Sequence, residues 1–402
     1  MTTLPRPAPV AARCPACDAR GLTDVFDVRG VPVFVGILHD DADSARRAPR
    51  GDVILAWCAS CGTVHNRVHD PARVHFRPGY EVSLAHSRTV RAYIEDVADR
   101  LVERYELAGR SVLEIGCGDG LFLRLLADRG IARGTGIDPT LAREGEERRG
   151  GARLRWIRDY FDPTRYPDLD PDFVASLSVF EDLSRPGEML RGLRARLRPD
   201  ARVYVEVWNA LDALENDETW GIHYEQCNLF GAASLAGAFR RAGFVVLDAG
   251  LCYAGGQYCF VEAAPAGGTE LDGPAPPAVA TPLRIPDALA RLAARHRDKV
   301  AAWAGRLAAH EAAGRRVVLW GSGGKGIGFL NGVPGADGIL AVVDINPDRQ
   351  GRFVPGTGHR IVSPAGAGDL APDVAILTNV LYESEIRTQA DELGMTCAFE
   401  AA

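Results

Sequence analysis

The chain has 402 residues, of which 47% are hydrophobic and 25% are charged, and its formal net charge is −7. This length predicts two or three domains, and the composition is typical of a soluble globular protein. Because there is no basic stripe, no signal-peptide pattern and no long apolar run, we expect no nucleic-acid partner, no secretion and no membrane span, and we expect a cytoplasmic location.

The first distinctive feature along the chain is two C-x-x-C pairs, formed by Cys14 with Cys17 and by Cys58 with Cys61. In a reducing compartment such pairs more often bind zinc than form disulfides, and four thiolates complete a closed tetrahedral shell. We therefore expect a structural zinc ion in an N-terminal lobe, residues 1–85, that has too few residues for a core of its own. A redox pair is the alternative, but neither pair lies between a strand and a helix.

A glycine-rich turn follows the cysteine lobe. Apolar residues at helical spacing predict a helix over residues 90–102, and an apolar strand, Ser111–Ile115, then runs into Gly116-Cys-Gly-Asp-Gly120. Glycines allow a tight turn and a close approach to a ligand. Asp138, in Gly-Ile-Asp-Pro, follows the second strand, where an acid can accept ribose hydroxyls.

The glycine spacing and the acid inside the strand resemble the class I methyltransferase signature, which implies that the chain binds S-adenosylmethionine (SAM). A dinucleotide site more often reads G-x-G-x-x-G. The residues expected to bind the cofactor, with Cys117 acting through its backbone, are Glu114, Gly116, Cys117, Gly118, Gly120, Asp138, Pro139, Asp159, Tyr160 and Ser178.

Strands and helices continue to alternate as far as residue 264. The patterns predict strands at Phe173–Leu177 and Arg202–Val207, a helix that Gly243 ends, and a closing hairpin formed by Phe244–Leu247 and Gln257–Glu262. Alternation of this kind predicts a mostly parallel sheet with both faces covered, so we assign residues 86–264 to one α/β domain.

Residues 265–286 are rich in proline and glycine and read as a linker before a second α/β domain, residues 287–402. A long helix is predicted at Asp287–Ala313, and the strand Arg315–Trp320 then leads into Gly321-Ser-Gly-Gly-Lys-Gly326. A second acid, Asp344, ends the next strand. This loop could bind a dinucleotide, bind the diphosphate of a substrate through the helix start and Lys325, or only pack a helix on a strand.

The order of these parts resembles the three-domain sugar C-methyltransferases of deoxysugar biosynthesis over nearly the whole chain. The residues that carry the resemblance are the cysteine pairs, the methyltransferase signature, and two C-terminal segments, Asp344-Ile-Asn-Pro-Asp-Arg-Gln-Gly351 and Pro355-Gly-Thr-Gly358. It implies a Rossmann-like C-terminal domain, structural zinc, and a nucleoside-diphosphate 4-keto-deoxysugar held between the middle and C-terminal domains. The methyl group would go to the carbon beside the ketone.

Methylation of carbon requires a general base for the proton beside the ketone and donors for the enolate oxygen. The resemblance places a histidine base where this chain has Gln226, and a second histidine where it has Asp182. Glutamine cannot take the proton. The catalytic candidates are Glu225 first and His223 second, followed by Tyr224, Asp182 and Tyr80.

The acceptor itself is expected to be a small molecule, and the chain to be a monomer or a homodimer. A surface histidine, an ion-paired glutamate and amphipathic core tyrosines are the structural alternatives for the catalytic candidates. Alternative functions are O-methylation of another metabolite, an NAD-dependent oxidoreductase and a non-catalytic SAM-binding partner. The residues expected to bind the substrate are His86, Gln226, Asn228, Gln257, Gly323, Lys325 and Asn379.

Overall fold

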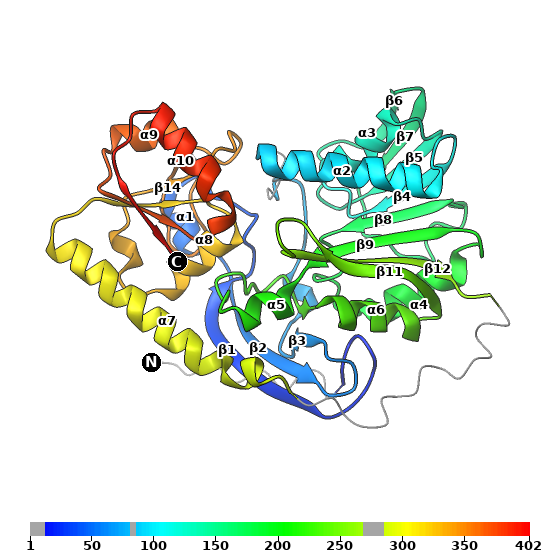
Figure 1. The fold of residues 1–402 in the computed structure, drawn as a ribbon, viewed down its shortest axis with the longest axis horizontal. Coiled ribbons are helices and arrows are strands. Elements are labelled where there is room, and N and C mark those ends of the chain that lie inside the picture. Colours follow the sequence, from blue (N-terminus) through cyan, green and yellow to red (C-terminus); the bar gives the residue numbers. More distant parts are fainter. Residues whose placement is uncertain (1–12, 81–85, 268–284) are drawn as a thin grey trace.

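The computed structural model describes residues 13–80, 86–267 and 285–402, which we call the N-terminal lobe, the middle domain and the C-terminal domain. Figure 1 shows the middle domain (cyan to green) beside the C-terminal domain (yellow to red), with the lobe (blue) below and between them. Most of the predicted linker, residues 268–284, lies outside the described residues.

The N-terminal lobe is built on a small antiparallel sheet with the strand order β1-β2-β3-β10. Its fourth strand, β10, comes from the middle domain, and its core includes Trp208 and Tyr224 of that domain and Leu289 and Leu292 of the C-terminal domain. The lobe therefore shares a core with both domains, in addition to any metal that holds it. Its elements are β1 (Leu22–Pro32), α1 (Ala42–Arg46), β2 (Arg50–Cys58), β3 (Val64–Asn66), the 3₁₀ turn η1 (Pro71–Arg73) and β10 (Asn228–Leu229).

The middle domain contains an eight-stranded sheet with the order β11-β12-β9-β8-β4-β5-β7-β6, in which β7, β5, β4, β8 and β9 are parallel. The predicted closing hairpin is confirmed as β11 and β12, which are longer than expected. The strands are β4 (Ser111–Ile115), β5 (Arg133–Ile137), β6 (Gly145–Arg149), β7 (Ala152–Ile157), β8 (Phe173–Leu177), β9 (Arg202–Trp208), β11 (Phe244–Cys252) and β12 (Tyr258–Pro265).

Helices cover both faces of this sheet, as the alternation of elements predicted (Figure 1). On one face α2 begins after its N-cap Ser87 and buries Val90, Val97 and Leu101, the spacing from which the helix was predicted. The helices of that face are α2 (Arg88–Tyr105) and α3 (Leu121–Asp128); α4 (Pro186–Arg196) and α6 (Ala232–Arg241) cover the other face, and α5 (Ala210–Glu215) follows β9.

The C-terminal domain is a second α/β unit with a parallel sheet ordered β15-β14-β13-β16-β17, reached through the long helix α7. Its elements are α7 (Asp287–Ala312), β13 (Val317–Trp320), α8 (Gly324–Gly332), η2 (Ala336–Gly338), β14 (Val342–Val343), β15 (Ile361–Val362), α9 (Pro364–Asp369), β16 (Val374–Leu377), η3 (Val380–Tyr382), α10 (Glu383–Glu392) and β17 (Ala398–Ala401).

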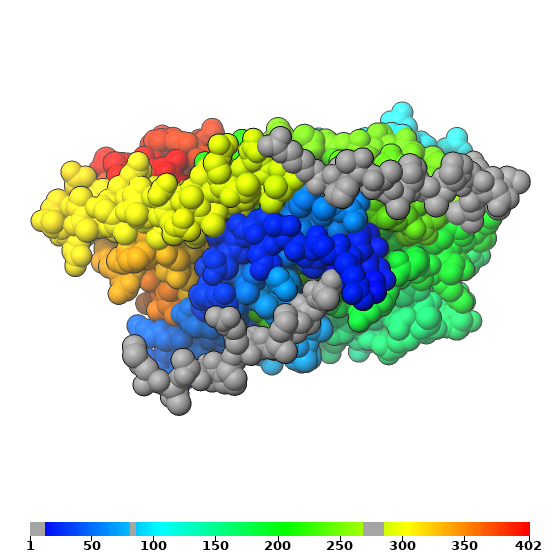
Figure 2. Space-filling view, turned by 90° about the horizontal axis from the view of Figure 1, so that it is seen from below, coloured from blue at the N-terminus to red at the C-terminus, as the bar shows by residue number. Residues whose placement is uncertain are grey.

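The lobe is joined to the C-terminal domain by hydrogen bonds that cross large sequence separations. The backbones of His39 and Phe353 pair at 3.1 and 2.9 Å, and the Arg50 guanidinium donates to the Gly356 carbonyl at 2.6 Å. Figure 2 shows the blue lobe from below, between the green middle domain and the orange C-terminal domain, with the yellow helix α7 along its edge. Within the described ranges, no helix combines the length and apolar content that a membrane span needs.

Candidate active site

A large cavity of about 1130 Å³ lies at the carboxyl ends of β4, β5 and β8 in the middle domain. Parallel sheets place ligands at this edge, where the strand order reverses. Aromatic side chains of the N-terminal lobe, Phe76 and Tyr80, form part of the opposite wall. Eight of the ten expected cofactor residues line this cavity: Glu114, Gly116, Cys117, Gly118, Asp138, Pro139, Tyr160 and Ser178.

The glycine turn after β4 leaves open space where a ligand would need it. Gly118 has φ +53°, and a Cβ placed on it would meet nothing within 4 Å. At Gly116 (φ +73°), by contrast, a Cβ would lie 2.1 Å from Cγ2 of Val179. The turn therefore needs glycine for packing at one position and presents bare backbone to the cavity at the other.

Two carboxylates accept hydrogen bonds from backbone amides in and after this turn. Oδ2 of Asp138 accepts a hydrogen bond from the Gly118 amide at 2.8 Å, and its Oδ1 accepts from the amide and hydroxyl of Thr140, each at 2.6 Å. Oε2 of Glu114 accepts from the Leu123 amide at 3.1 Å, and burial raises the pKa of Glu114. Glu114 thus ties β4 to α3 across the turn, while Asp138 holds the turn itself and lines the cavity.

Two expected cofactor residues do not line the large cavity. Gly120 packs under Trp156, whose ring would lie 2.5 Å from an added Cβ. The carboxylate of Asp159 is held by the Tyr166 hydroxyl at 2.6 Å and by Arg165 at 2.8 Å. Asp119 and Trp156 also line the large cavity and were not predicted. Asp119 lies within the glycine turn, which could have indicated it, whereas Trp156 lies inside β7 and carried no such signal.

A small cavity of about 400 Å³ lies between the middle and C-terminal domains. Its wall combines the strand ends of the C-terminal sheet with the segment before β10 and the start of α2. Six of the seven expected substrate residues line it: His86, Gln226, Gln257, Gly323, Lys325 and Asn379. The large and small cavities share Tyr80, Ser178 and Asp182 in their walls.

Glu225 is the most enclosed acid of the small cavity, with a residue exposure of 1%. Its Oε1 accepts hydrogen bonds from the Val35 amide at 3.2 Å and the Tyr80 hydroxyl at 3.0 Å, both from the N-terminal lobe. Its Oε2 is buried and has no hydrogen-bond partner among the described residues. Burial raises the pKa of Glu225 to about 8, although these two hydrogen bonds oppose the shift.

A second acidic pair, Glu181 and Asp182, follows β8 on the same wall. Burial raises the pKa of Glu181 to about 7. Burial, and then the charges of Glu181 and Glu225, raise the pKa of Asp182 well above the ordinary carboxyl value. Glu181 was not predicted as a site residue, although it is adjacent to Asp182 in the sequence.

His223 and Lys325 bring together the middle domain and the glycine loop of the C-terminal domain. A Cβ on Gly324 would lie 2.1 Å from Nε2 of His223, so this glycine allows the two segments to pack. Burial, and then the charge of Lys325, lower the pKa of His223 to about 4. The ammonium of Lys325 pairs with Glu218 at 2.9 Å.

Two predicted site residues lie away from both cavities. The Tyr224 ring packs on Gly51 of β2, and its hydroxyl accepts from the Asp70 amide at 3.0 Å. Asn228 belongs to β10, pairs with β3, and donates to the Leu183 carbonyl. Neither side chain forms part of a cavity wall, because the lobe sheet uses both for packing.

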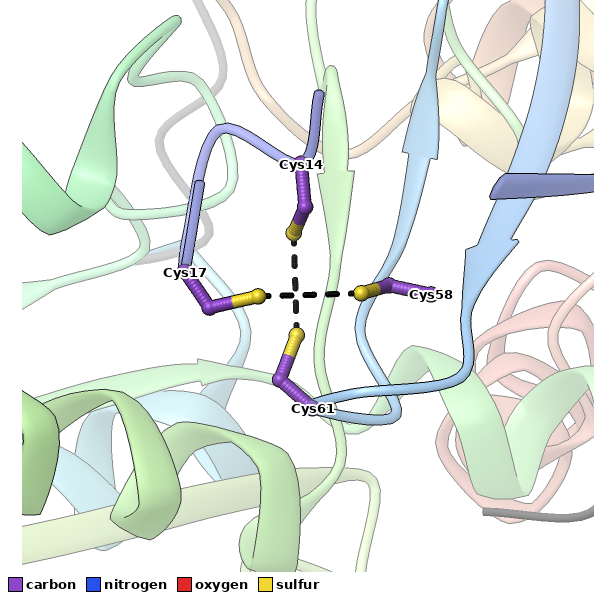
Figure 3. Close-up of side chains that lie close together, drawn as sticks. All are labelled: Cys14, Cys17, Cys58 and Cys61. Atoms are coloured by element: carbon purple, nitrogen blue, oxygen red, sulfur yellow. Dashed lines mark hydrogen bonds between the residues drawn. The ribbon is translucent and has the colours of Figure 1, made fainter. Parts of the chain in front are cut away.

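The four cysteines of the two C-x-x-C pairs point toward one centre in the N-terminal lobe (Figure 3). Their Sγ atoms all lie within 4.8 Å of one another, with 3.6 Å between Cys14 and Cys61 and 3.7 Å between Cys17 and Cys58. Zn–S bonds of about 2.3 Å in a tetrahedron give S–S edges of about 3.8 Å. The cluster therefore has the size and donor set of a closed zinc site.

Comparisons with known proteins agree with this arrangement. A methyltransferase domain model matches residues 86–249, and a C-methyltransferase C-terminal domain model matches residues 282–397. The C-methyltransferase NovU of Streptomyces niveus is 27% identical over 93% of this chain and 90% of its own length. A ubiquinone biosynthesis O-methyltransferase of Aeromonas salmonicida is 31% identical, but over only 26% of this chain and 45% of its own.

Among solved structures, the PH0226 protein of Pyrococcus horikoshii is 15% identical, covering 48% of this chain and 100% of its own, with a TM-score of 0.38. A similarity of this size supports no argument about the site.

The fold, the glycine turn and the two domain models define a SAM-dependent methyltransferase. Within that class, the chain belongs to the SAM-dependent C-methyltransferase family that includes NovU. The family resemblance expected from the sequence is thereby confirmed.

Proposed function

We propose that this enzyme transfers the methyl group of SAM to the carbon beside the ketone of a nucleoside-diphosphate deoxysugar. The observation that carries the proposal is the shared wall formed by Tyr80, Ser178 and Asp182. A methyl donor in the large cavity and an acceptor in the small cavity would meet at these residues. Reacting atoms must approach to about 3 Å, and adjoining cavities supply that proximity.

The walls of the small cavity suit a substrate that carries a diphosphate. The start of α8 brings the amides of Gly323 and Gly324 to this cavity, and helix starts attract phosphate. Lys325 supplies a cation, and its present partner Glu218 could be displaced by a diphosphate oxygen. The match to a C-methyltransferase C-terminal domain supports a role for this domain in binding the acceptor.

The chemistry assigns distinct tasks to the two walls. Bound SAM would supply an electrophilic methyl group, and the open backbone at Gly118 with the carboxylate of Asp138 fits its amino-acid and ribose parts. The chain must itself exclude water, remove the acceptor proton and stabilise the enolate oxygen. Tyr80 would contact that oxygen, and the presence of this residue in the walls of both cavities supports that role.

O-methylation is the second candidate, because Gln226 lines the small cavity where a histidine base would be expected from the resemblance. An alcohol activated by a carboxylate would need no imidazole.

The experiment that tests the proposal measures S-adenosylhomocysteine formation with a panel of uridine- and thymidine-diphosphate 4-keto-deoxysugars and with the corresponding 4-hydroxy sugars. We expect product with at least one ketosugar and none with its alcohol. Turnover only with alcohols would establish O-methylation, and no turnover on either set would contradict a nucleotide-sugar acceptor.

A further inference from the structure

Asp182 occupies the place where the two cavities meet. It lies in the short turn that follows β8, where Ser178 has φ +55° and the Asp182 amide donates to the Val179 carbonyl at 2.9 Å. This turn brings Ser178 and Asp182 into the walls of both cavities. Glu181 and Glu225, the neighbouring acids, line the small cavity alone.

The hydrogen bonds of the three acids separate their tasks. Glu225 is held through Oε1 by Val35 and Tyr80, and Oε1 of Glu181 accepts from the Trp208 amide at 3.4 Å. Each of the three acids has one buried oxygen without a hydrogen-bond partner among the described residues: Oε2 of Glu181, Oε2 of Glu225 and Oδ1 of Asp182. Asp182 differs from the two glutamates because its carboxylate is not anchored through its other oxygen either, within the described residues, and because it lines both cavities. A carboxylate oxygen left without a donor in a cavity wall is available to accept a proton from a ligand.

We propose that Asp182 is the general base that removes the proton from the acceptor carbon, and that Glu225 is a positioning residue that acts through Tyr80. This assignment rests on the proposed function. The C–H bond beside the ketone breaks, its proton moves to the Asp182 carboxylate, and its electron pair becomes the enolate. That pair then forms the new bond to the methyl carbon while the C–S electron pair remains on sulfur, and the proton later leaves Asp182 for solvent.

Tyr80 and Glu225 complete this arrangement. In this structure the single hydroxyl proton of Tyr80 is donated to Glu225 at 3.0 Å, which fixes the position of the ring. With an acceptor bound, that proton would turn to the enolate oxygen, and the hydroxyl oxygen would accept from Glu225 instead. Because burial favours the protonated form of Glu225, its own proton can support Tyr80 in that task. Ketosteroid isomerase likewise combines an aspartate base with a tyrosine at the oxyanion.

Burial also makes Asp182 a stronger base once it is ionised, since it raises the pKa of this carboxyl. At the position where the resemblance places a histidine, the carboxylate of Asp182 would therefore still accept the proton.

The test measures exchange of the acceptor's carbon-bound hydrogen with D₂O by NMR, with a thymidine-diphosphate 4-keto-deoxysugar and without SAM. Proton removal is thus observed apart from methyl transfer. We expect exchange in the wild type and a loss of at least about a hundredfold in Asp182→Asn, the usual contribution of a general base. Glu225→Gln should slow exchange less, and Asp182→Glu should restore part of it.

Asp168→Asn, a change at an exposed aspartate before β8, is the matched control and should exchange at the wild-type rate. Asp182→Asn should still bind SAM and should unfold cooperatively at a temperature no lower than that of the wild type, which separates lost chemistry from lost structure. Exchange in Asp182→Asn at the wild-type rate would overturn the assignment alone. Absence of exchange and of methylation in the wild type, with every ketosugar tested, would overturn the proposed function and the assignment with it.

Discussion

Two aspartates occupy equivalent places in the two parallel sheets. Asp138 follows β5 and binds back to the Gly118 amide at 2.8 Å, and Asp344 follows β14 and binds back to the Ser322 amide at 3.0 Å. In each domain the acid after the second strand thus holds the loop after the first. Only the turn at Gly118 opens into the large cavity, so the same local device should serve SAM in one domain and not in the other.

The change Asp138→Ala tests this difference. It removes a charged acceptor from the cavity wall and a brace from the turn, so SAM affinity should fall by roughly 1.5–3 kcal/mol, or about ten- to a hundredfold in Kd. Calorimetric titration measures the effect. Asp344→Ala is the matched control and should leave SAM affinity unchanged. Equal losses in both variants would mean that the large cavity is not the SAM site.

A second prediction at the residue scale concerns Glu225 and pH. Because burial raises its pKa to about 8, the folded protein keeps this carboxyl protonated at a pH where the unfolded chain ionises it. The stability gained from the protonated form is complete below the unfolded pKa, about 4.3, and is lost as pH rises toward 8.

In Glu225→Gln this side chain cannot ionise, so the variant does not lose stability in this way as the pH rises. Its free energy of unfolding should therefore rise relative to the wild type by about 2 kcal/mol between about pH 6 and about pH 8, measured by denaturant titration. Glu103→Gln, at an exposed position on α2, should track the wild type at both pH values. A difference that does not depend on pH would show that Glu225 is ionised in the folded protein.

The segment around Glu225 also shows what residue-level prediction could and could not reach. The positions of Asp182, Gln226 and Lys325 in a cavity wall followed from loops at strand ends and from the resemblance. The sequence did not predict that His223 would line the cavity and Tyr224 would not, because adjacent residues of a loop follow no regular periodicity. Tertiary packing decides these positions, because β2 takes the tyrosine ring and α8 meets the histidine.

At the scale of elements, α8 shows that a glycine motif can serve two purposes. Gly323 lies in the wall of the small cavity, and a Cβ placed on it would meet nothing within 4 Å. On Gly328, however, a Cβ would lie 2.1 Å from the Trp220 carbonyl oxygen of the middle domain. The sequence could not decide between ligand binding and packing for this segment. In the structure different glycines are available for the two roles, Gly323 at the cavity and Gly328 at the contact with the middle domain.

The packing role predicts that Gly328→Ala is destabilising. The added methyl group must push the C-terminal domain from the Trp220 backbone, and overpacking of this kind costs about 1–3 kcal/mol. Gly305→Ala, in an exposed position of α7 with open space around it, should instead stabilise by about 0.5–1 kcal/mol. Thermal unfolding checks both, and an unchanged Gly328→Ala would place the two segments farther apart.

A second prediction at the level of elements concerns the two C-x-x-C pairs of the N-terminal lobe. If zinc holds the loop before β1 against the end of β2, Cys58→Ser should lose the metal and lower the unfolding temperature, because metal binding contributes to folding. Atomic emission measures the metal content. Cys397→Ser, in the C-terminal domain, should keep both zinc and stability. Metal-free wild type, prepared in zinc-containing medium, would contradict a zinc site.

The elements that the sequence predicted are those with strong apolar periodicity, such as β4, β8, β9, α2 and α7. It did not predict β6, whose residues are charged and largely exposed, because an edge strand lacks an apolar pattern. Nor did it predict that β10 would join the lobe sheet, since a two-residue strand is defined by its partner and not by its own residues.

For the whole molecule, the three parts act together at one place. The middle domain supplies the large cavity, the C-terminal domain closes the small cavity, and the lobe contributes Tyr80 to the wall between them. The lobe and the C-terminal domain are also bonded directly, through Arg50 and Gly356. The lobe that carries the four-cysteine cluster thus contributes one residue, Tyr80, to the walls of both cavities.

Methylation of carbon can be tested directly with SAM that carries a ¹³C-labelled methyl group and with a thymidine-diphosphate 4-keto-deoxysugar as the acceptor. We expect a product in which NMR shows the labelled carbon coupled to the carbon beside the ketone. A labelled carbon attached to oxygen, or unreacted sugar in the presence of an enzyme that binds SAM, would contradict methylation of carbon.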